Sequence, residues 1–186
     1  MGATPLSNTV NISNNTITGS YNTATSGLFY GIWNNGVTPT TLNILNNTVE
    51  NITYGGTTGT GAIYPLYTTG SNAASSFNLN NNTVRNISRT GTTGGTTIGI
   101  FVSAGVNNMV INVNDNSISN MSISGTGTAS TMYGIQVPTG TVSVNDNQIN
   151  NLICVKTSGT GEINGIRSVT SPNNENYNNN TIHTLT

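Results

Sequence analysis

The stretch Ile44-Leu45-Asn46-Asn47-Thr48-Val49-Glu50-Asn51-Ile52 recurs six times, with small changes, along this chain of 186 residues. Successive copies lie 31 to 35 residues apart, and their second Asn positions are Asn15, Asn47, Asn82, Asn116, Asn147 and Asn180. A repeat of this length is typical of a solenoid, in which each unit buries its apolar side against the next. The repeat therefore indicates the architecture of the chain more directly than its activity.

Apolar residues return at fixed distances from the second Asn of each copy. Three positions before it stand Ile12, Ile44, Leu79, Val113, Val144 and Tyr177. Two positions after it stand Ile17, Val49, Val84, Ile118, Ile149 and Ile182, and five after it stand Ser20, Ile52, Ile87, Met121, Leu152 and Leu185. Before the Asn pair, apolar and polar residues alternate with the period of a strand. Because β-branched residues fill these positions and helix formers are scarce, we expect two strands that meet at a bend.

A second, weaker motif lies between the Asn copies and predicts a third strand. It reads Tyr30-Gly31-Ile32, Tyr64-Pro65-Leu66, Ile98-Gly99-Ile100, Tyr133-Gly134-Ile135 and Asn164-Gly165-Ile166, each after a Gly/Thr/Ser-rich loop. Three short strands per unit predict an all-β, right-handed parallel β-helix, with residues 1–186 as one domain of about six coils of roughly 33 residues. With strands ~4.8 Å apart the rod would be about 25–30 Å long. An antiparallel sandwich also has many short strands, but it does not explain one fixed Asn phase.

Composition excludes several classes of function. Charged residues make up 5% of the chain and the net charge is −1, so no basic patch is available for nucleic acid. No apolar run reaches the ~18–20 residues that cross a bilayer. The single cysteine, Cys154, excludes a disulfide within the chain. Because repeat-like sequence follows Met1-Gly2 at once, we expect a fragment of a longer repetitive protein.

The Asn-Asn-Thr and Gly-Ile motifs resemble those of right-handed parallel β-helix repeat proteins, the pectate-lyase-like superfamily in the broad sense. Within that group the chain is most similar to the Asn/Thr/Gly-rich repeats of large bacterial surface proteins. The resemblance implies a non-catalytic structural or adhesive module located outside the cell or at its surface. The superfamily also holds lyases, hydrolases and tailspikes, so the motifs are specific for fold and not for function. Because no capping helix is evident, we also expect end-to-end stacking of copies.

The repeated motif itself has a structural explanation. Asn tolerates the left-handed backbone conformation that a sharp bend needs, and Asn amides stacked in register can form a hydrogen-bonded ladder. This predicts an asparagine ladder through the six second Asn positions. Three positions later, Glu50 should face Arg85 in the next coil and form a surface ion pair worth about 0.2–1 kcal/mol. His183 shares that column without a carboxylate beside it, and we interpret it as an ordinary surface histidine.

Asp115 and Asp146 are the strongest candidates for chemistry. They replace the first Asn in two consecutive copies, so their carboxylates should lie one strand spacing apart. Such a pair can share Ca²⁺ with amide oxygens, or act as the two carboxyl groups of a glycosidase, which lie about 5–10 Å apart. The interpretation we favour is that Asp replaces Asn in the turn. None of the basic residues shares this column, and Arg89 and Lys156 are expected in or beside loops. We therefore predict no enzyme, no metal and no cofactor.

A column of aromatic residues invites a binding hypothesis. Two positions after each Gly stand Trp33, Tyr67 and Phe101, followed by Gln136 and Arg167. Strand alternation places this column outside, where it can serve as a platform for glycans or protein, or stabilise stacked coils as a ladder. The alternative functions are therefore a carbohydrate-binding or polysaccharide-cleaving module. A third is an ice-binding solenoid, for which the column of Thr16, Thr48, Thr83, Ser117, Gln148 and Thr181 is an imperfect match.

Overall fold

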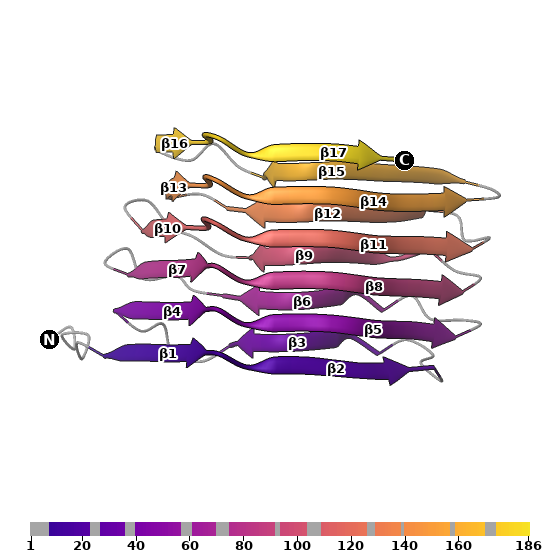
Figure 1. The fold of residues 1–186 in the computed structure, drawn as a ribbon, viewed down its shortest axis with the longest axis horizontal. Helices are drawn as coiled ribbons and strands as arrows, with labels where there is room; N and C mark the ends of the chain where they lie inside the picture. The colour runs from indigo at the N-terminus through magenta and orange to yellow at the C-terminus, as the bar shows by residue number, and fades with distance from the viewer. Residues whose placement is uncertain are drawn as a thin grey trace, which may run out of the picture.

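The computed structural model describes residues 8–22, 27–35, 40–56, 61–69, 75–91, 94–103, 109–125, 129–138, 140–156, 159–169 and 174–186. Within these ranges the chain forms seventeen strands in three parallel sheets and no helix (Figure 1). The Gly/Thr/Ser loops predicted before the third strand lie mostly outside the described residues. The described part of the chain contains no helix long and apolar enough to cross a membrane.

Each sheet collects the same strand from successive repeats. The first sheet holds the strands that precede the Asn pair: β1 (Thr9–Ser13), β4 (Thr41–Leu45), β7 (Ser76–Asn80), β10 (Val110–Asn112), β13 (Thr141–Ser143) and β16 (Asn174–Asn176). The second holds those that follow it: β2 (Thr16–Tyr21), β5 (Thr48–Gly56), β8 (Thr83–Gly91), β11 (Ser117–Gly125), β14 (Gln148–Lys156) and β17 (Thr181–Leu185). The third holds the Gly-Ile strands: β3 (Phe29–Asn34), β6 (Ile63–Thr68), β9 (Thr96–Val102), β12 (Ala129–Val137) and β15 (Thr160–Ser168).

This arrangement confirms the predicted parallel β-solenoid with three strands per turn, and it corrects the number of coils. Two sheets have six strands, but the third sheet has five among the described residues. Fewer than six turns are therefore complete, because the last repeat supplies only β16 and β17.

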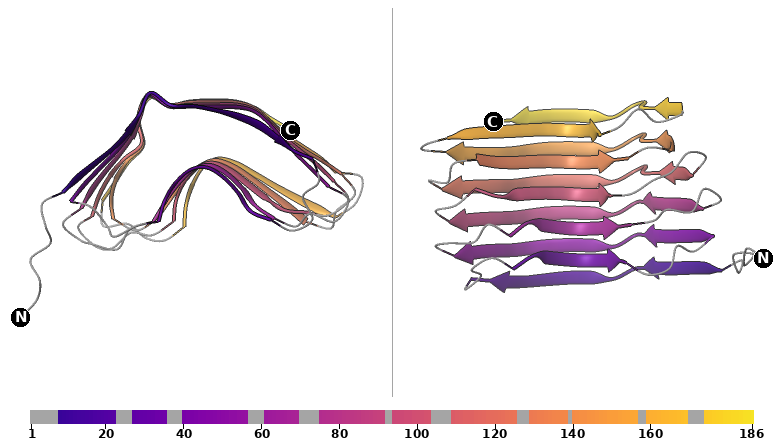
Figure 2. Two further views of the ribbon diagram at one scale, coloured as in Figure 1. Left: turned by 90° about the horizontal axis from the view of Figure 1, so that it is seen from below. Right: turned by 180° about the vertical axis from the view of Figure 1, so that it is seen from behind.

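The hand of the solenoid is visible in Figure 2. The left view looks from below, with the first repeat nearest to the reader, and the chain passes from β1 over β2 to β3 in the clockwise direction as later repeats recede. Clockwise travel away from the viewer is a right-handed turn. This is the hand expected of parallel crossovers, because right-twisted strands return to their sheet most easily that way.

The core consists of the apolar columns that the repeat predicts. Pairing joins Ile44 to Leu79 in the first sheet and Val49 to Val84 in the second, and all four residues are fully buried. One member was predicted wrongly: Gly19, not Ser20, pairs with Ile52. The first repeat lacks one residue that all later copies have in this strand, so its register shifts after Thr18.

The third sheet arches toward the other two sheets, which leaves its outer face concave (Figure 2, left). Glycine at the centre of the motif makes this close approach possible. A Cβ atom added to Gly134 would lie 2.5 Å from the carbonyl oxygen of Gly165 and 2.9 Å from a methyl carbon of Ile149. Neither the backbone nor the packed core can accommodate such a contact. The Gly-Ile motif therefore marks a bend in the strand as well as a core position.

Candidate functional site

The two asparagines of the motif have different roles in the structure. The first residue of each pair adopts a left-handed conformation, with φ between 55° and 59°. We call these residues the turn column: Asn14, Asn46, Asn81, Asp115, Asp146 and Asn179. All six are exposed. Asn and Asp tolerate this conformation better than other residues with a side chain, which explains why no other residue type occurs here.

Asp115 and Asp146 take their places in the turn column without changing it. The backbone N–H of each donates to a carbonyl oxygen of the next repeat at 3.0 Å, as the N–H of Asn46 does at 3.2 Å. Their dihedral angles match those of the neighbouring asparagines. Both carboxylates are exposed, and the described residues contain no group of three or more Asp, Glu, His or Cys side chains that could hold a metal ion. The geometry fits the interpretation that Asp replaces Asn in the turn, and the calcium alternative stays a hypothesis.

The second asparagine of each pair forms the predicted ladder, here called the buried ladder. The Oδ1 atom of Asn82 accepts the backbone N–H of Asn47 at 3.0 Å and its Nδ2–H at 3.1 Å. The Nδ2 of Asn82 in turn donates to Oδ1 of Asn116 at 3.1 Å and to the carbonyl oxygen of Ile44 at 2.9 Å. The same contacts join Asn15 to Asn47, Asn116 to Asn147 and Asn147 to Asn180.

Burial makes this ladder a structural element. The four inner members, Asn47, Asn82, Asn116 and Asn147, are at most 1% exposed. Burying a polar amide is costly unless its donors and acceptors find partners, and the contacts above use both Nδ2 hydrogens and both acceptor positions of each inner amide. No hydrogen-bonding capacity is left over for a ligand. The buried ladder therefore holds the repeats together.

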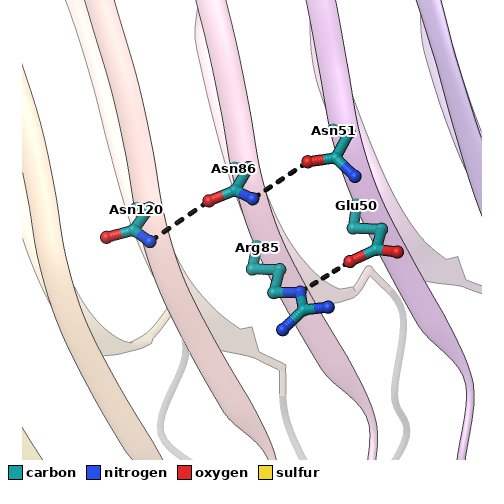
Figure 3. A network of polar contacts seen from close by, with 5 residues as sticks. All are labelled: Glu50, Asn51, Arg85, Asn86 and Asn120. Atoms are coloured by element: carbon teal, nitrogen blue, oxygen red, sulfur yellow. Dashed lines mark hydrogen bonds and ion pairs between the residues drawn. The ribbon is translucent and has the colours of Figure 1, made fainter.

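A second line of amides, the outer column, runs along the surface of the second sheet (Figure 3). Asn86 Nδ2 donates to Asn51 Oδ1 at 2.9 Å, and Asn120 Nδ2 donates to Asn86 Oδ1 at 3.1 Å. Asn151 Nδ2 extends the line to Asn120 at 2.7 Å. These residues also have φ of 54° to 56°, so β5, β8, β11 and β14 bend here for a second time.

Beside the outer column lies the predicted ion pair. The Nε atom of Arg85 is 2.6 Å from the Oε2 atom of Glu50, which occupies the paired position in the neighbouring strand (Figure 3). The Arg85 side chain is 52% exposed, so solvent screens the attraction and its contribution to stability is small. His183, in the same column, is exposed and its Nδ1 atom lies 3.2 Å from Thr184 Oγ1. No carboxylate is recorded beside it among the described residues.

Five aromatic side chains from three strands fill the concave outer face of the third sheet. This aromatic array consists of Tyr30, Trp33, Tyr64, Tyr67 and Phe101. It contains the three residues predicted as a platform, together with two tyrosines from the position before the central Gly or Pro. These two tyrosines are not among the predicted platform residues, although their spacing of 34 residues matches the repeat.

The rings of the array stack on one another both across the arch and along the solenoid. Across the arch, Tyr30 and Trp33 have centroids 4.4 Å apart and planes inclined by 15°. Along the axis, Tyr67 lies 5.1 Å from Phe101 and 6.3 Å from Trp33. Burial raises the pKa of the Tyr30 and Tyr64 hydroxyls. Since neighbouring rings cover each other's faces, most of this array stabilises stacked strands, and Trp33, 47% exposed, keeps the most open surface.

Polar side chains continue the two lines of the array over the next strands. The Arg167 guanidinium lies 4.7 Å above the Tyr133 ring, and its Nη1 atom donates to the Tyr133 hydroxyl at 2.7 Å. Burial raises the pKa of Tyr133. Gln136, which alternation places outside, is only 7% exposed because the concave face encloses it. The outer face of the third sheet thus changes from aromatic to polar along the axis.

Arg89 is a buried cation, whereas the sequence predicts it in or beside a loop. It lies in β8, not in a loop, and is 2% exposed. Its guanidinium lies 5.1 Å above the ring of Tyr54 and donates to the carbonyl oxygen of Gly61, and also to that of Gly94 at 3.4 Å. Burial lowers its pKa, while Tyr54 acts in the opposite direction. Lys156, also expected at a loop, ends β14.

The alternation of side chains along β8 indicates that Arg89 points inward. Counting by two from the core residue Ile87 along β8 places residue 89 inside, and pairing joins it to Tyr54 on one side and Ile123 on the other. Three carbonyl and aromatic partners satisfy the buried cation, so its role is to join the second sheet to the start of the third.

The comparisons with known proteins return no relative. No protein-family model, no curated protein and no solved structure matches the chain. The fold nevertheless defines its class, which is a parallel β-solenoid with three strands per turn and stacked asparagine side chains. The resemblance to β-helix repeat proteins is thereby confirmed at the level of fold.

Proposed function

We propose that this chain is a non-catalytic structural or adhesive β-solenoid module of a bacterial extracellular protein, related to the Asn/Thr/Gly-rich repeats of large surface proteins. The observation that carries the proposal is the uninterrupted buried ladder, which runs from Asn15 to Asn180 with the same contacts at every step. A catalytic repeat has to depart locally from the pattern to position reactive groups. The repeats that contain Asp115 and Asp146 keep the turn and the ladder of their neighbours.

The proposal includes end-to-end association of copies as a partner interaction. Hollows of about 520 Å³ and 480 Å³ lie at the two edges of the solenoid, the first beside Gly19 and Phe29 and the second beside Ile166 and Ile182. Ile182 and Leu185 are exposed, whereas Ile149 and Leu152 in the preceding repeat are buried. Apolar surface of this kind favours association. Sedimentation velocity over a range of concentrations tests it, and a monomer at all concentrations would refute it.

A second candidate function is carbohydrate binding at the outer face of the third sheet. The exposed Trp33 ring and the Gln136, Tyr133 and Arg167 side chains that follow it combine an apolar platform with hydrogen-bonding groups, as sugar sites do. The mutual stacking of the rings supports the structural role more strongly. The ice-binding alternative has only its single imperfect Thr column.

The experiment that separates these functions combines a turnover assay with a binding screen. The wild-type chain is incubated with a panel of polysaccharides and the release of reducing ends is measured, with the double variant Asp115→Asn/Asp146→Asn as control. Turnover that the double variant loses would overturn the non-catalytic proposal. A glycan array then compares wild type, Trp33→Ala and Tyr67→Ala with Val155→Ala, an exposed apolar residue on another sheet. Binding lost only in the first two variants would establish the carbohydrate-binding alternative.

A further inference from the structure

The described residues contain eight Asn-x-Ser/Thr triplets, the acceptor pattern of N-linked glycosylation. They begin at Asn11, Asn14, Asn46, Asn51, Asn81, Asn86, Asn120 and Asn179. The fold favours Asn at its turn and at its second bend, where Ser or Thr often follows two positions later, so the pattern alone does not separate acceptors from structural asparagines. The surroundings of each amide do.

The structure separates six of the eight amides by their hydrogen bonds; Asn11 and Asn51 only accept a bond, through Oδ1, and are left out of the comparison. Four belong to the turn column, where they are exposed at the outermost corner of the solenoid: Asn14, Asn46, Asn81 and Asn179. Within the described part of the chain, their side chains have no hydrogen-bond partner. By contrast, the Nδ2 atoms of Asn86 and Asn120 donate to the outer column at 2.9 Å and 3.1 Å (Figure 3). An amide nitrogen engaged in this way is held against the neighbouring Asn, and a sugar attached to it would disturb that bond.

The hydroxyl that completes each triplet is also accessible at the turn. Thr48 and Thr83 are the first residues of β5 and β8, and each precedes a fully buried core valine. Because side chains alternate along a strand, these threonines face outward. Both are partly exposed. The turn thus presents the Asn amide and the Thr hydroxyl on the same outer surface.

We propose that the asparagines of the turn column are acceptor sites for N-linked glycosylation, and that Asn86 and Asn120 are not. The co-substrate would be a sugar activated as a nucleotide or lipid diphosphate, supplied with a glycosyltransferase. The Nδ2 atom forms a bond to the anomeric carbon and loses one proton, while the carbon–oxygen bond to the phosphate breaks and the diphosphate leaves with its electron pair. The chain contributes an unbonded, exposed amide. The inference goes beyond the structural role and does not depend on it.

The two aspartates provide a matched pair for the test. Asp115 and Asp146 have φ of 58° and 57° in the same turn, where a carboxylate cannot accept the sugar. Asp115 is followed by Asn116-Ser117, whereas Asp146 is followed by Asn147-Gln148. The substitution Asp115→Asn therefore creates a new acceptor triplet, and Asp146→Asn places an identical amide in an identical turn without one.

The experiment incubates the folded 186-residue chain with an Asn-x-Ser/Thr-specific glycosyltransferase and a nucleotide-activated hexose, and maps occupancy by mass spectrometry of peptides. Denatured chain is treated in parallel to show that all eight triplets are substrates. We expect occupancy at the turn column to exceed that at Asn86 and Asn120 by roughly fivefold or more, the ratio set by one net hydrogen bond. Asp115→Asn should gain one site, Asp146→Asn should gain none, and Thr48→Val should lose Asn46.

Three results would overturn the proposal. The first is equal occupancy of Asn86 or Asn120 and the turn column in the folded chain. The second is an unmodified folded chain when the denatured chain is modified. The third is an Asp115→Asn variant that folds, by its circular dichroism spectrum, and gains no sugar. The polysaccharide turnover assay is independent of each of these outcomes, so a failure here leaves the non-catalytic proposal to its own test.

Discussion

Replacement of Asn82 by alanine removes one member of the buried ladder from the middle of the solenoid. Four hydrogen bonds disappear: two that Asn82 Oδ1 accepts from Asn47, and two that its Nδ2 donates to Asn116 and Ile44. The N–H and one Nδ2 hydrogen of Asn47 then lose their acceptor in a place where neither residue is more than 1% exposed. At about 1–3 kcal/mol for each of these two buried groups, the free energy of unfolding should fall by about 2–6 kcal/mol.

Asn15→Ala is the matched control, because it removes the same side chain from the exposed first position of the ladder. Only two bonds are lost, from Nδ2 to Asn47 Oδ1 and to the carbonyl oxygen of Ser13, and Asn47 Oδ1 still accepts the backbone N–H of Asn15. The expected cost is about 1 kcal/mol. Urea unfolding followed by circular dichroism measures both variants. Solenoids can unfold in segments, so the slope of the transition has to be compared as well as its midpoint. Equal losses in the two variants would show that burial of the ladder does not matter.

Three further predictions concern other columns, the first two measured by urea unfolding. Arg89→Ala should reduce the free energy of unfolding by about 2–4 kcal/mol because it empties a buried site and leaves carbonyl groups unpaired. Arg85→Ala, its exposed control, should cost at most about 1 kcal/mol. Equal costs would contradict the buried position of Arg89. Asn46→Ala should cost about 1–2 kcal/mol because alanine resists a left-handed turn, and Asp146→Asn should change stability by less than about 0.5 kcal/mol. Burial raises the pKa of Tyr54, Tyr64 and Tyr133, so stability should be constant up to about pH 10 and fall as the pH rises through these raised values. Thermal melting between pH 8 and 12 measures this loss, which Tyr54→Phe should reduce.

Repetition made most of the fold predictable. The position of Val49 has the same character in every copy, so one interpretation had to fit six times. The parallel register with its Glu50–Arg85 pair followed from the alignment of copies. Long-range contacts, which a single sequence ordinarily hides, appear here as the repeat itself.

What could not be predicted depends on departures from the repeat and on curvature. The missing residue after Thr18 pairs Gly19 with the core residue Ile52, although Gly19 itself is exposed, and nothing local marks such a shift. The arch of the third sheet brings Tyr30 onto Trp33, although residues three apart in a flat strand lie on opposite faces. Arg89 was predicted in or beside a loop, although its position two residues after Ile87 in the strand alternation indicates a buried side chain. The two residues of the Asn pair have different roles, since the first forms the turn and the second forms the hydrogen-bonded ladder. Only the φ angles and the hydrogen bonds of the structure distinguish these roles.

The buried ladder also affects the deamidation of asparagine side chains. Asparagine is thermolabile because the backbone nitrogen of the next residue can attack its side-chain carbonyl and expel ammonia. The turn-column residues Asn14, Asn46 and Asn81 are each followed by a member of the buried ladder. The backbone N–H of that member donates to an amide oxygen of the following repeat at 2.9 to 3.0 Å. This hydrogen bond hinders the attack of that backbone nitrogen on the side-chain carbonyl of the preceding Asn. The contacts that hold the strands in register thus also protect these exposed turn asparagines.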